Sequence, residues 1–167
     1  MKTLISFKDI LIRTELVPGD LGYVIHMHGK LYRKEYNYGL NFESYVAAGI
    51  HEFFESMAAS RSRGWVCEKN GKIVGFLALM DRGEQAQVRY FILDPSVRGV
   101  GLGKKLIELY MDYLRSSGFK GSYLLTTKEL PAAAHLYRSH GFKLMEEHPA
   151  HHPFGKDVIE QRYELVL

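Results

Sequence analysis

The stretch from Gln87 to Lys105 constrains what this chain can fold into more than any other. It predicts a strand, a glycine-rich turn and the start of a long helix, in that order. Pro95 ends the strand, because proline has no N–H to donate to a sheet ladder. The glycines within residues 99–103 carry no Cβ, so the backbone can turn tightly there and a ligand can approach it closely.

The helix after the turn is predicted from apolar residues at helical spacing: Leu102, Leu106, Leu109, Tyr110, Tyr113 and Leu114. Its first-turn N–H groups open onto the turn, and such a helix end binds anions, phosphate above all. Arg98 just before the helix, with Lys104 and Lys105 just inside it, adds positive charge. We therefore expect a phosphate site at this turn.

Two familiar phosphate loops do not fit the glycine turn. A Walker loop needs Gly-Lys-Ser/Thr, whereas Lys104 is followed by Lys105, and Arg98 stands at the place of its first glycine. A dinucleotide fingerprint that started at Gly99 would need its third glycine at Lys104. The pattern that fits is Arg-x-x-Gly-x-Gly, from Arg98 to Gly103.

This pattern resembles the pyrophosphate loop of the GNAT superfamily of N-acetyltransferases. Residues 64–79 resemble the family's central hairpin, and residues 121–147 resemble its second cofactor-contacting segment. Residues 16–40 and 148–163 also resemble a subgroup that is sometimes fused to a MarR-type DNA-binding domain. The resemblance implies an α/β (α+β) fold, in which a mixed, mostly antiparallel central sheet of about six or seven strands is flanked by about four helices.

The same resemblance implies acetyl-CoA (coenzyme A) as the cofactor. In this family the strand 86–93 splays from its neighbour, and its freed backbone pairs with the amide arm of the coenzyme; an ordinary central strand is the alternative. Simple alternation would place Gln87, Arg89, Phe91 and Leu93 on one face and Val88, Tyr90 and Ile92 on the other. The implied cofactor-binding residues are Ile92, Leu93, Arg98, Gly99, Val100, Gly101, Leu102, Gly103 and Lys104.

Tyr137 takes the position of the family's usual acid, which protonates the leaving thiolate; the alternative is a packing residue of a helix from Leu130 to Ser139. Two expected groups are missing. Histone-type relatives have a glutamate base about where Gln87 stands, and many relatives have an asparagine where Leu130 stands.

The candidate bases that are left are Glu35, His28 and an ordered water, and we favour Glu35 or His28 assisted by water. Both are polar residues on the inward stripe of a helix that follows Asp20, its expected N-cap. The alternative is that His28 is a satisfied core histidine and that Glu35 frays at the helix end.

Several other segments give weaker signals. Residues 4–15 predict a first strand and residues 43–59 a helix. Tyr36, Tyr38 and Phe42 form an aromatic patch that is either core or a wall of the substrate pocket. The adjacent His151 and His152 lack further ligands at useful spacing, so we expect no metal; a loop histidine that touches the acceptor is favoured instead.

Length and composition bound the class of protein. The chain has 167 residues, which is the usual size of one domain, so we interpret residues 1–167 as a single N-acetyltransferase domain. The net charge of +3 is too small for a nucleic-acid-binding surface, so we expect no nucleic-acid partner. No apolar run approaches membrane-spanning length, so we expect no association with a membrane. Cys67 is single, which excludes an internal disulfide and suits the cytoplasm. A homodimer is common for this fold, but no stretch demands one.

The sequence thus predicts an acetyl-CoA-dependent N-acetyltransferase that acts on a primary amine of a small molecule or a protein, by direct attack in a ternary complex. Two alternatives stay open. One is a non-catalytic CoA-binding sensor or regulatory module, motivated by the missing carboxylate at Gln87 and the apolar Leu130. The other is generic nucleotide binding.

Overall fold

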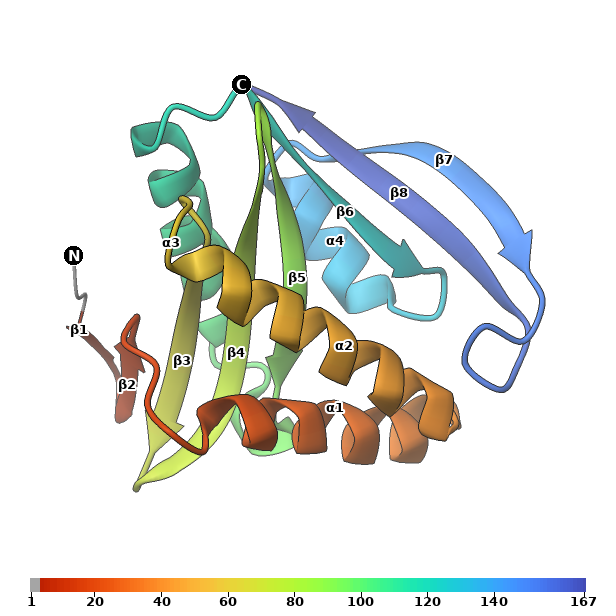
Figure 1. Cartoon of the computed structure of the whole chain (residues 1–167), viewed down its shortest axis with the longest axis horizontal. Helices are drawn as coiled ribbons and strands as arrows, with labels where there is room; N and C mark the ends of the chain where they lie inside the picture. Colours follow the sequence, from red (N-terminus) through yellow and green to blue (C-terminus); the bar gives the residue numbers. More distant parts are fainter. Residues whose placement is uncertain (1–3) are drawn as a thin grey trace.

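One sheet of eight strands runs through the computed structural model, which describes residues 4–167 (Figure 1). The strands lie in the order β1-β2-β3-β4-β5-β6-β8-β7. Their bounds are β1 Leu4–Phe7, β2 Ile10–Arg13, β3 Arg63–Lys69, β4 Lys72–Arg82, β5 Gln85–Leu93, β6 Gly121–Thr127, β7 Lys143–Ala150 and β8 Val158–Val166. The helices are α1 Asp20–Tyr36, α2 Leu40–Met57, α3 Leu102–Ser116 and α4 Pro131–Ser139, with a short 3-10 helix, η1, at Pro95–Val97.

Neighbouring strands are antiparallel except β5 and β6, which run parallel. The predicted mixed, mostly antiparallel sheet with four flanking helices is therefore confirmed. The additional strand comes from residues 4–15, which form a hairpin rather than the single strand predicted. Lys8 takes the left-handed conformation in its turn, with φ at 55°, and Phe7 pairs with Ile10.

The pairing between β5 and β6 is short. It extends only from Gln85–Gln87 to Gly121–Tyr123, and beyond it the two strands spread apart (Figure 1). The edge of β5 from Val88 to Leu93 therefore faces β6 without a ladder across the gap. This splayed geometry is the one that the resemblance implied for the strand.

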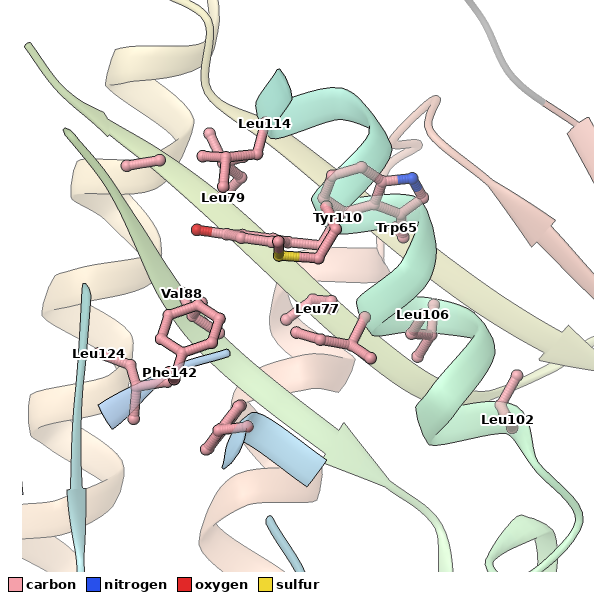
Figure 2. Close-up of a cluster of buried hydrophobic side chains, with 14 of the residues drawn as sticks. Trp65, Leu77, Leu79, Val88, Leu102, Leu106, Tyr110, Leu114, Leu124 and Phe142 are labelled. Carbon is pink, nitrogen blue, oxygen red and sulfur yellow. The ribbon is translucent and has the colours of Figure 1, made fainter. Parts of the chain in front are cut away.

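Helices α3 and α4 cover one face of the sheet, and α1 and α2 cover the other (Figure 1). Figure 2 shows the apolar stripe of α3 over the sheet, with Leu106, Tyr110 and Leu114 turned toward Trp65, Leu77 and Leu79. The helical spacing predicted this stripe, and burying it fixes the position of α3. The glycine turn before α3 is thereby fixed against the end of β5.

A β-bulge at Tyr90 makes the predicted alternation along β5 wrong. Tyr90 has φ at 55°, and the register against β4 shifts at this point. Because a bulge inserts one extra residue, the side chains after it change faces. Arg89 therefore points to the α2 side of the sheet, as Tyr90 and Ile92 do, whereas Phe91 and Leu93 pack on the α3 side.

Asp20 is not the N-cap of α1. Gly19 occupies that position with φ at 100°, and the buried Asp20 is the first helical residue. Its carboxylate accepts hydrogen bonds from the N–H of Val17 at 2.8 Å and from the guanidinium of Arg13 at 2.7 and 2.9 Å. Asp20 thus ties the start of α1 to β2. Helix α2 begins three residues earlier than predicted, at Leu40.

Candidate active site

A cavity of about 430 Å³ opens where β5 and β6 diverge. Residues from α1, α2, β5, the glycine turn and α4 line it. The cavity brings together all three predicted catalytic residues with five of the predicted cofactor residues: His28, Glu35, Tyr137, Ile92, Leu93, Arg98, Gly99 and Gly103. The other four, Val100, Gly101, Leu102 and Lys104, continue the turn into α3.

The glycine turn leaves the start of α3 open. Gly99 and Gly101 have φ at 75° and 90°, a conformation that side chains disfavour, and a Cβ at Gly99 would meet no described atom within 4 Å. Gly101 is the N-cap and makes no side-chain hydrogen bond. Within residues 4–167, the first-turn amides thus have no capping side chain. Leu102 presents only its backbone here, because its side chain is buried in the core.

Arg98 links the turn to α1 and to the end of β5. Its Nη1 and Nη2 donate to the two carboxylate oxygens of Glu35, at 3.1 and 2.8 Å, and its Nε donates to the carbonyl of Leu93 at 3.1 Å. Glu35 therefore does not fray at the helix end. It lies in the cavity wall, but its carboxylate is engaged by a cation.

Lys8 is a further cation at the turn, which sequence reasoning missed. Its Nζ donates to the carbonyl of Val100 at 2.8 Å. The ring of Phe7 lies 3.7 Å from where a Cβ of Gly101 would stand. The β1–β2 hairpin thus packs against the glycine turn. No motif marks this contact, since it joins residues 92 positions apart.

Tyr137 is buried in the wall formed by α4. Its ring packs against Phe91 at 6.2 Å, Phe142 at 6.0 Å and Tyr163 at 6.4 Å between centroids. Burial raises the pKa of Tyr137 well above its ordinary value. The phenol therefore keeps its proton at working pH.

His28 is buried under the cavity and is neutral. Its Nδ1 lies 2.8 Å from the carbonyl oxygen of Val24, so Nδ1 carries the hydrogen and Nε2 is the acceptor. The ring stacks on Tyr32 and meets Tyr90 edge-on, with centroids 5.9 Å apart in both cases. Burial lowers the pKa of His28 to about 4. His28 is thus both a core histidine and a cavity residue.

The two positions where expected groups are missing have structural explanations. The side-chain oxygen of Gln87 accepts hydrogen bonds from Nε of Arg82 at 2.9 Å and from the hydroxyl of Tyr123 at 3.4 Å. Leu130 lines the cavity as an apolar group. Neither can take up a proton.

Tyr90 and Gly49 fit tightly between β5 and α2. The hydroxyl of Tyr90 is buried and has no hydrogen-bond partner within residues 4–167. A Cβ at Gly49 would lie 1.9 Å from that hydroxyl and 2.9 Å from Nη2 of Arg89. Only glycine at position 49 leaves room for both side chains.

The predicted aromatic patch is both core and cavity wall. The rings of Tyr32 and Phe42 stack at 4.5 Å, and Tyr38 lies 5.0 Å from Phe42. Phe154, from the loop between β7 and β8, adds a ring 5.2 Å from Tyr38. The N–H of Gly39 donates to the carbonyl of Phe154 at 2.8 Å, which joins this loop to the α1–α2 corner.

The same loop also reaches the end of β6. Lys156 pairs with Glu129, whose other oxygen accepts from the Tyr38 hydroxyl at 2.9 Å. The Lys156 ammonium also donates to the carbonyl of Tyr36 at 2.8 Å. We call these contacts, together with the Gly39–Phe154 bond, the loop clasp.

The loop histidines lie elsewhere. The side chains of His151 and His152 are 84% and 72% exposed, stand 3.6 Å from Asp157, and are not among the residues that line the main cavity. The placement of these two side chains therefore does not support the expectation that a loop histidine touches the acceptor, which stays a prediction. Across residues 4–167 no group of three or more His, Cys, Asp or Glu residues could hold a metal ion.

Comparisons with known proteins agree with this geometry. The model of the acetyltransferase (GNAT) family matches residues 26–142. An uncharacterized N-acetyltransferase of Escherichia coli, YjgM, is 35% identical over 115 residues, which cover 64% of this chain and 68% of that protein. This chain belongs to the GNAT family of acetyltransferases.

Solved structures show the same fold. An acetyltransferase from Streptococcus agalactiae superposes with a TM-score of 0.78 at 23% identity, over 96% of this chain and all of that one. Spermidine N-acetyltransferase from Vibrio cholerae, solved with CoA and spermine, has a TM-score of 0.70 at 20% identity, over 96% of each chain. None of the helices described in residues 4–167 is long and apolar enough to cross a membrane.

Proposed function

We propose that this protein is an acetyl-CoA-dependent N-acetyltransferase that acetylates a primary amine of a small molecule or a protein by direct attack in a ternary complex. One observation carries the proposal. A single cavity joins a cationic glycine turn at an open helix end, an unpaired strand edge and a buried neutral tyrosine. Each of these suits a different part of acetyl-CoA.

The turn suits the diphosphate. The backbone N–H groups of Gly99 to Lys104 would donate to it, because a helix N-terminus stabilises negative charge. The guanidinium of Arg98 and the ammonium of Lys8 add two cations beside them. The unpaired edge of β5 at Ile92 and Leu93 would hold the amide arm, as a neighbouring strand would.

Tyr137 would serve as the acid. In the transfer, a C–N bond forms to the acceptor amine while the C–S bond of the thioester breaks. The leaving sulfur needs a proton, and the hydroxyl of Tyr137, which lines the cavity and keeps its proton at working pH, would supply it. The amine must lose its own proton before or during attack.

Neither predicted base is well suited to keep that proton. Glu35 already accepts two hydrogen bonds from Arg98. The imidazole of His28, with a pKa of about 4, is too weak a base to hold a proton at pH 7. We propose that Nε2 of His28 instead orients a water, which passes the proton to solvent, and that Glu35 positions Arg98.

A turnover assay tests the proposal. Free CoA would be measured with acetyl-CoA and a panel of amino acids, polyamines, aminoglycosides and peptides, and calorimetry would measure acetyl-CoA binding separately. Consumption of at least one amine supports the proposal. Tight binding without turnover would favour the sensor alternative, whose support is the absence of a carboxylate at Gln87 and of a polar group at Leu130. ADP competing as well as CoA would favour generic nucleotide binding.

Other features of the sequence stay predictions. These are the single domain 1–167, the cytoplasmic location, the absence of a nucleic-acid partner and a homodimer. The resemblance of residues 16–40 and 148–163 to the MarR-fused subgroup is also a prediction. The two segments contact each other through the loop clasp, which is consistent with their acting as one unit.

A further inference from the structure

We infer that the acceptor is an amine that carries a carboxylate close to its amino group, as an α-amino acid does, and that Arg89 binds this carboxylate. The inference rests on the proposed function and names the substrate class of the same cavity. It starts from the bulge at Tyr90, which turns Arg89 to the α2 side of β5 and into the cavity wall.

Arg89 has hydrogen-bonding capacity to spare. Its side chain is only 11% exposed, yet its side-chain hydrogen bonds are long: Nη2 to the hydroxyl of Tyr45 at 3.3 Å and Nη1 to Glu52 at 3.5 Å. By contrast, Arg98 makes a bidentate pair at 2.8 and 3.1 Å. A guanidinium has five N–H donors in a planar fork that matches a carboxylate.

The charges in the cavity wall do not balance. Among the described residues, three charged side chains line the cavity: Glu35, Arg89 and Arg98. Glu35 and Arg98 neutralise each other. Glu52 is shared, and its closer partner is Arg82, so it compensates Arg89 only in part. The lining therefore carries an excess positive charge at Arg89, in a site that is largely withdrawn from water.

This charge selects among amines. A polyamine would bring more positive charge beside Arg89 and would be repelled. The carboxylate of an amino acid would pair with Arg89 and supply the missing anion. The rings of Tyr32, Phe42 and Tyr45 line the same cavity, so an apolar or aromatic side chain can be accommodated.

The placement also suits the reaction. Arg89 and Tyr137 line one cavity from opposite sides of the sheet, with the β5 edge between them. An amino group next to a carboxylate held by Arg89 would face the strand edge where the thioester is expected. Arg89 is thus a specificity-determining residue and not an acid or a base.

Matched pairs of acceptors test the inference. The value of kcat/KM would be compared for L-phenylalanine and 2-phenylethylamine, and for L-leucine and 3-methylbutylamine, with spermidine as a cationic probe. We expect the carboxylate-bearing member of at least one pair to be preferred by about ten- to a hundredfold, the usual range for a charge-assisted hydrogen bond. In Arg89→Gln that ratio should fall toward one, and in Arg89→Lys it should be intermediate.

Glu52→Gln should have the opposite effect to Arg89→Gln. Glu52 is on the surface side of Arg89 and competes for its guanidinium, so its neutralisation should raise the preference for the carboxylate. Arg89→Gln and Glu52→Gln remove charges of opposite sign from the same ion pair, which makes each the control for the other. Cooperative thermal unfolding checks that both variants are folded. If Arg89→Gln and Glu52→Gln changed the preference for the carboxylate-bearing acceptor equally and in the same direction, the inference would be overturned.

A binding measurement separates this inference from the proposed function. N-acetyl-L-phenylalanine and N-acetyl-2-phenylethylamine would be titrated into the protein with CoA present. Tighter binding of the carboxylate ligand, lost in Arg89→Gln, supports the inference even if no amine is turned over. Turnover that is as fast with carboxylate-free amines overturns the inference but leaves the acetyltransferase intact. Equal binding of both ligands to wild type and variant also overturns it.

Discussion

Glu35 holds the guanidinium of Arg98 with both carboxylate oxygens, at 2.8 and 3.1 Å, across the mouth of the cavity. The pair joins helix α1 to the glycine turn. A carboxylate beside the expected diphosphate opposes the binding of that anion, whereas a guanidinium favours it. The two residues thus act on coenzyme affinity with opposite signs.

Glu35→Gln should therefore strengthen acetyl-CoA binding about three- to tenfold, with the effect reduced at high salt. Calorimetry at low and high ionic strength measures this. Glu55→Gln, an exposed position of α2, makes the same charge change at the surface and should have no effect. If turnover instead falls by about a hundredfold or more at unchanged affinity, Glu35 is the base.

Tyr137→Phe should slow turnover by about a hundredfold or more, because the phenol is the proposed proton donor to the leaving thiolate. The affinity for acetyl-CoA should change little, since the ring and its packing are kept. Tyr110→Phe is the matched control: it removes another buried hydroxyl, hydrogen-bonded to Ser122 at 2.6 Å in the core, and should reduce stability but not turnover. Equal turnover of Tyr137→Phe and wild type would contradict the assignment.

Arg98→Glu combined with Gly101→Val should weaken acetyl-CoA binding by more than about a hundredfold. The first change reverses a charge at the turn. The second forces a branched side chain into a left-handed conformation, beside the ring of Phe7, and so disturbs the backbone whose N–H groups would bind the anion. Gly83→Val imposes the same backbone cost in the β4–β5 turn, where a Cβ meets no described atom within 4 Å, and should leave affinity unchanged. Undiminished binding by the folded double variant would remove the basis of the phosphate site.

Folding stability should fall as the pH is lowered from 6.5 to 4, partly because of His28. An unfolded histidine takes up a proton near pH 6.5, whereas burial keeps the folded imidazole neutral down to its pKa of about 4. The unfolded state therefore binds more protons in this window. Each pH unit then changes the unfolding free energy by at most about 1.4 kcal/mol, so the total is about 3 kcal/mol.

Denaturant titrations at several pH values measure this dependence in wild type and in His28→Gln. The difference between the two curves isolates the contribution of His28 from that of the carboxylates. We expect the variant to lose stability less steeply between pH 6.5 and 4. Parallel curves would mean that folding leaves the pKa of His28 unchanged and would contradict the effect of burial.

Gly49→Ala should destabilise the protein by about 1–3 kcal/mol, because the added methyl group overlaps the Tyr90 hydroxyl. Tyr90→Phe removes that buried, unpaired hydroxyl and should itself stabilise the fold by about 1 kcal/mol. In the double variant the clash is partly relieved, so the two changes should not be additive. Thermal denaturation of the four proteins completes the cycle; strict additivity would contradict the tight fit.

Local patterns in the sequence predicted helix α3 and the glycine turn, whereas the arrangement of the sheet was implied by the resemblance to the GNAT superfamily. The spacing of Leu102, Leu106 and Leu114 predicted α3, and the glycines before it predicted an open helix end, because both depend on neighbouring residues. The pairing of Glu35 with Arg98 could not be predicted, because it joins residues 63 positions apart. From the sequence alone, Glu35 is therefore predicted either as a candidate base or as a residue that frays at the helix end.

Arg89 was missed for a different reason. Alternation along a regular strand places it with Phe91, and only a bulge moves it to the other face. Tyr90 carries no signal of that bulge, since an aromatic residue is typical of a regular strand and disfavours positive φ. A specificity-determining side chain was thus hidden by one backbone irregularity.

The sheet is tied on both sides of its split: by the three-residue β5–β6 ladder at one end and by the loop clasp at the other. Neither tie is made by the residues assigned to coenzyme or acceptor binding. The spacing of β5 and β6 is therefore fixed by contacts that the residues assigned to ligand binding do not make. Shortening or lengthening the segment 151–157 would therefore alter the contacts at one end of the split and leave the β5–β6 ladder at the other end unchanged.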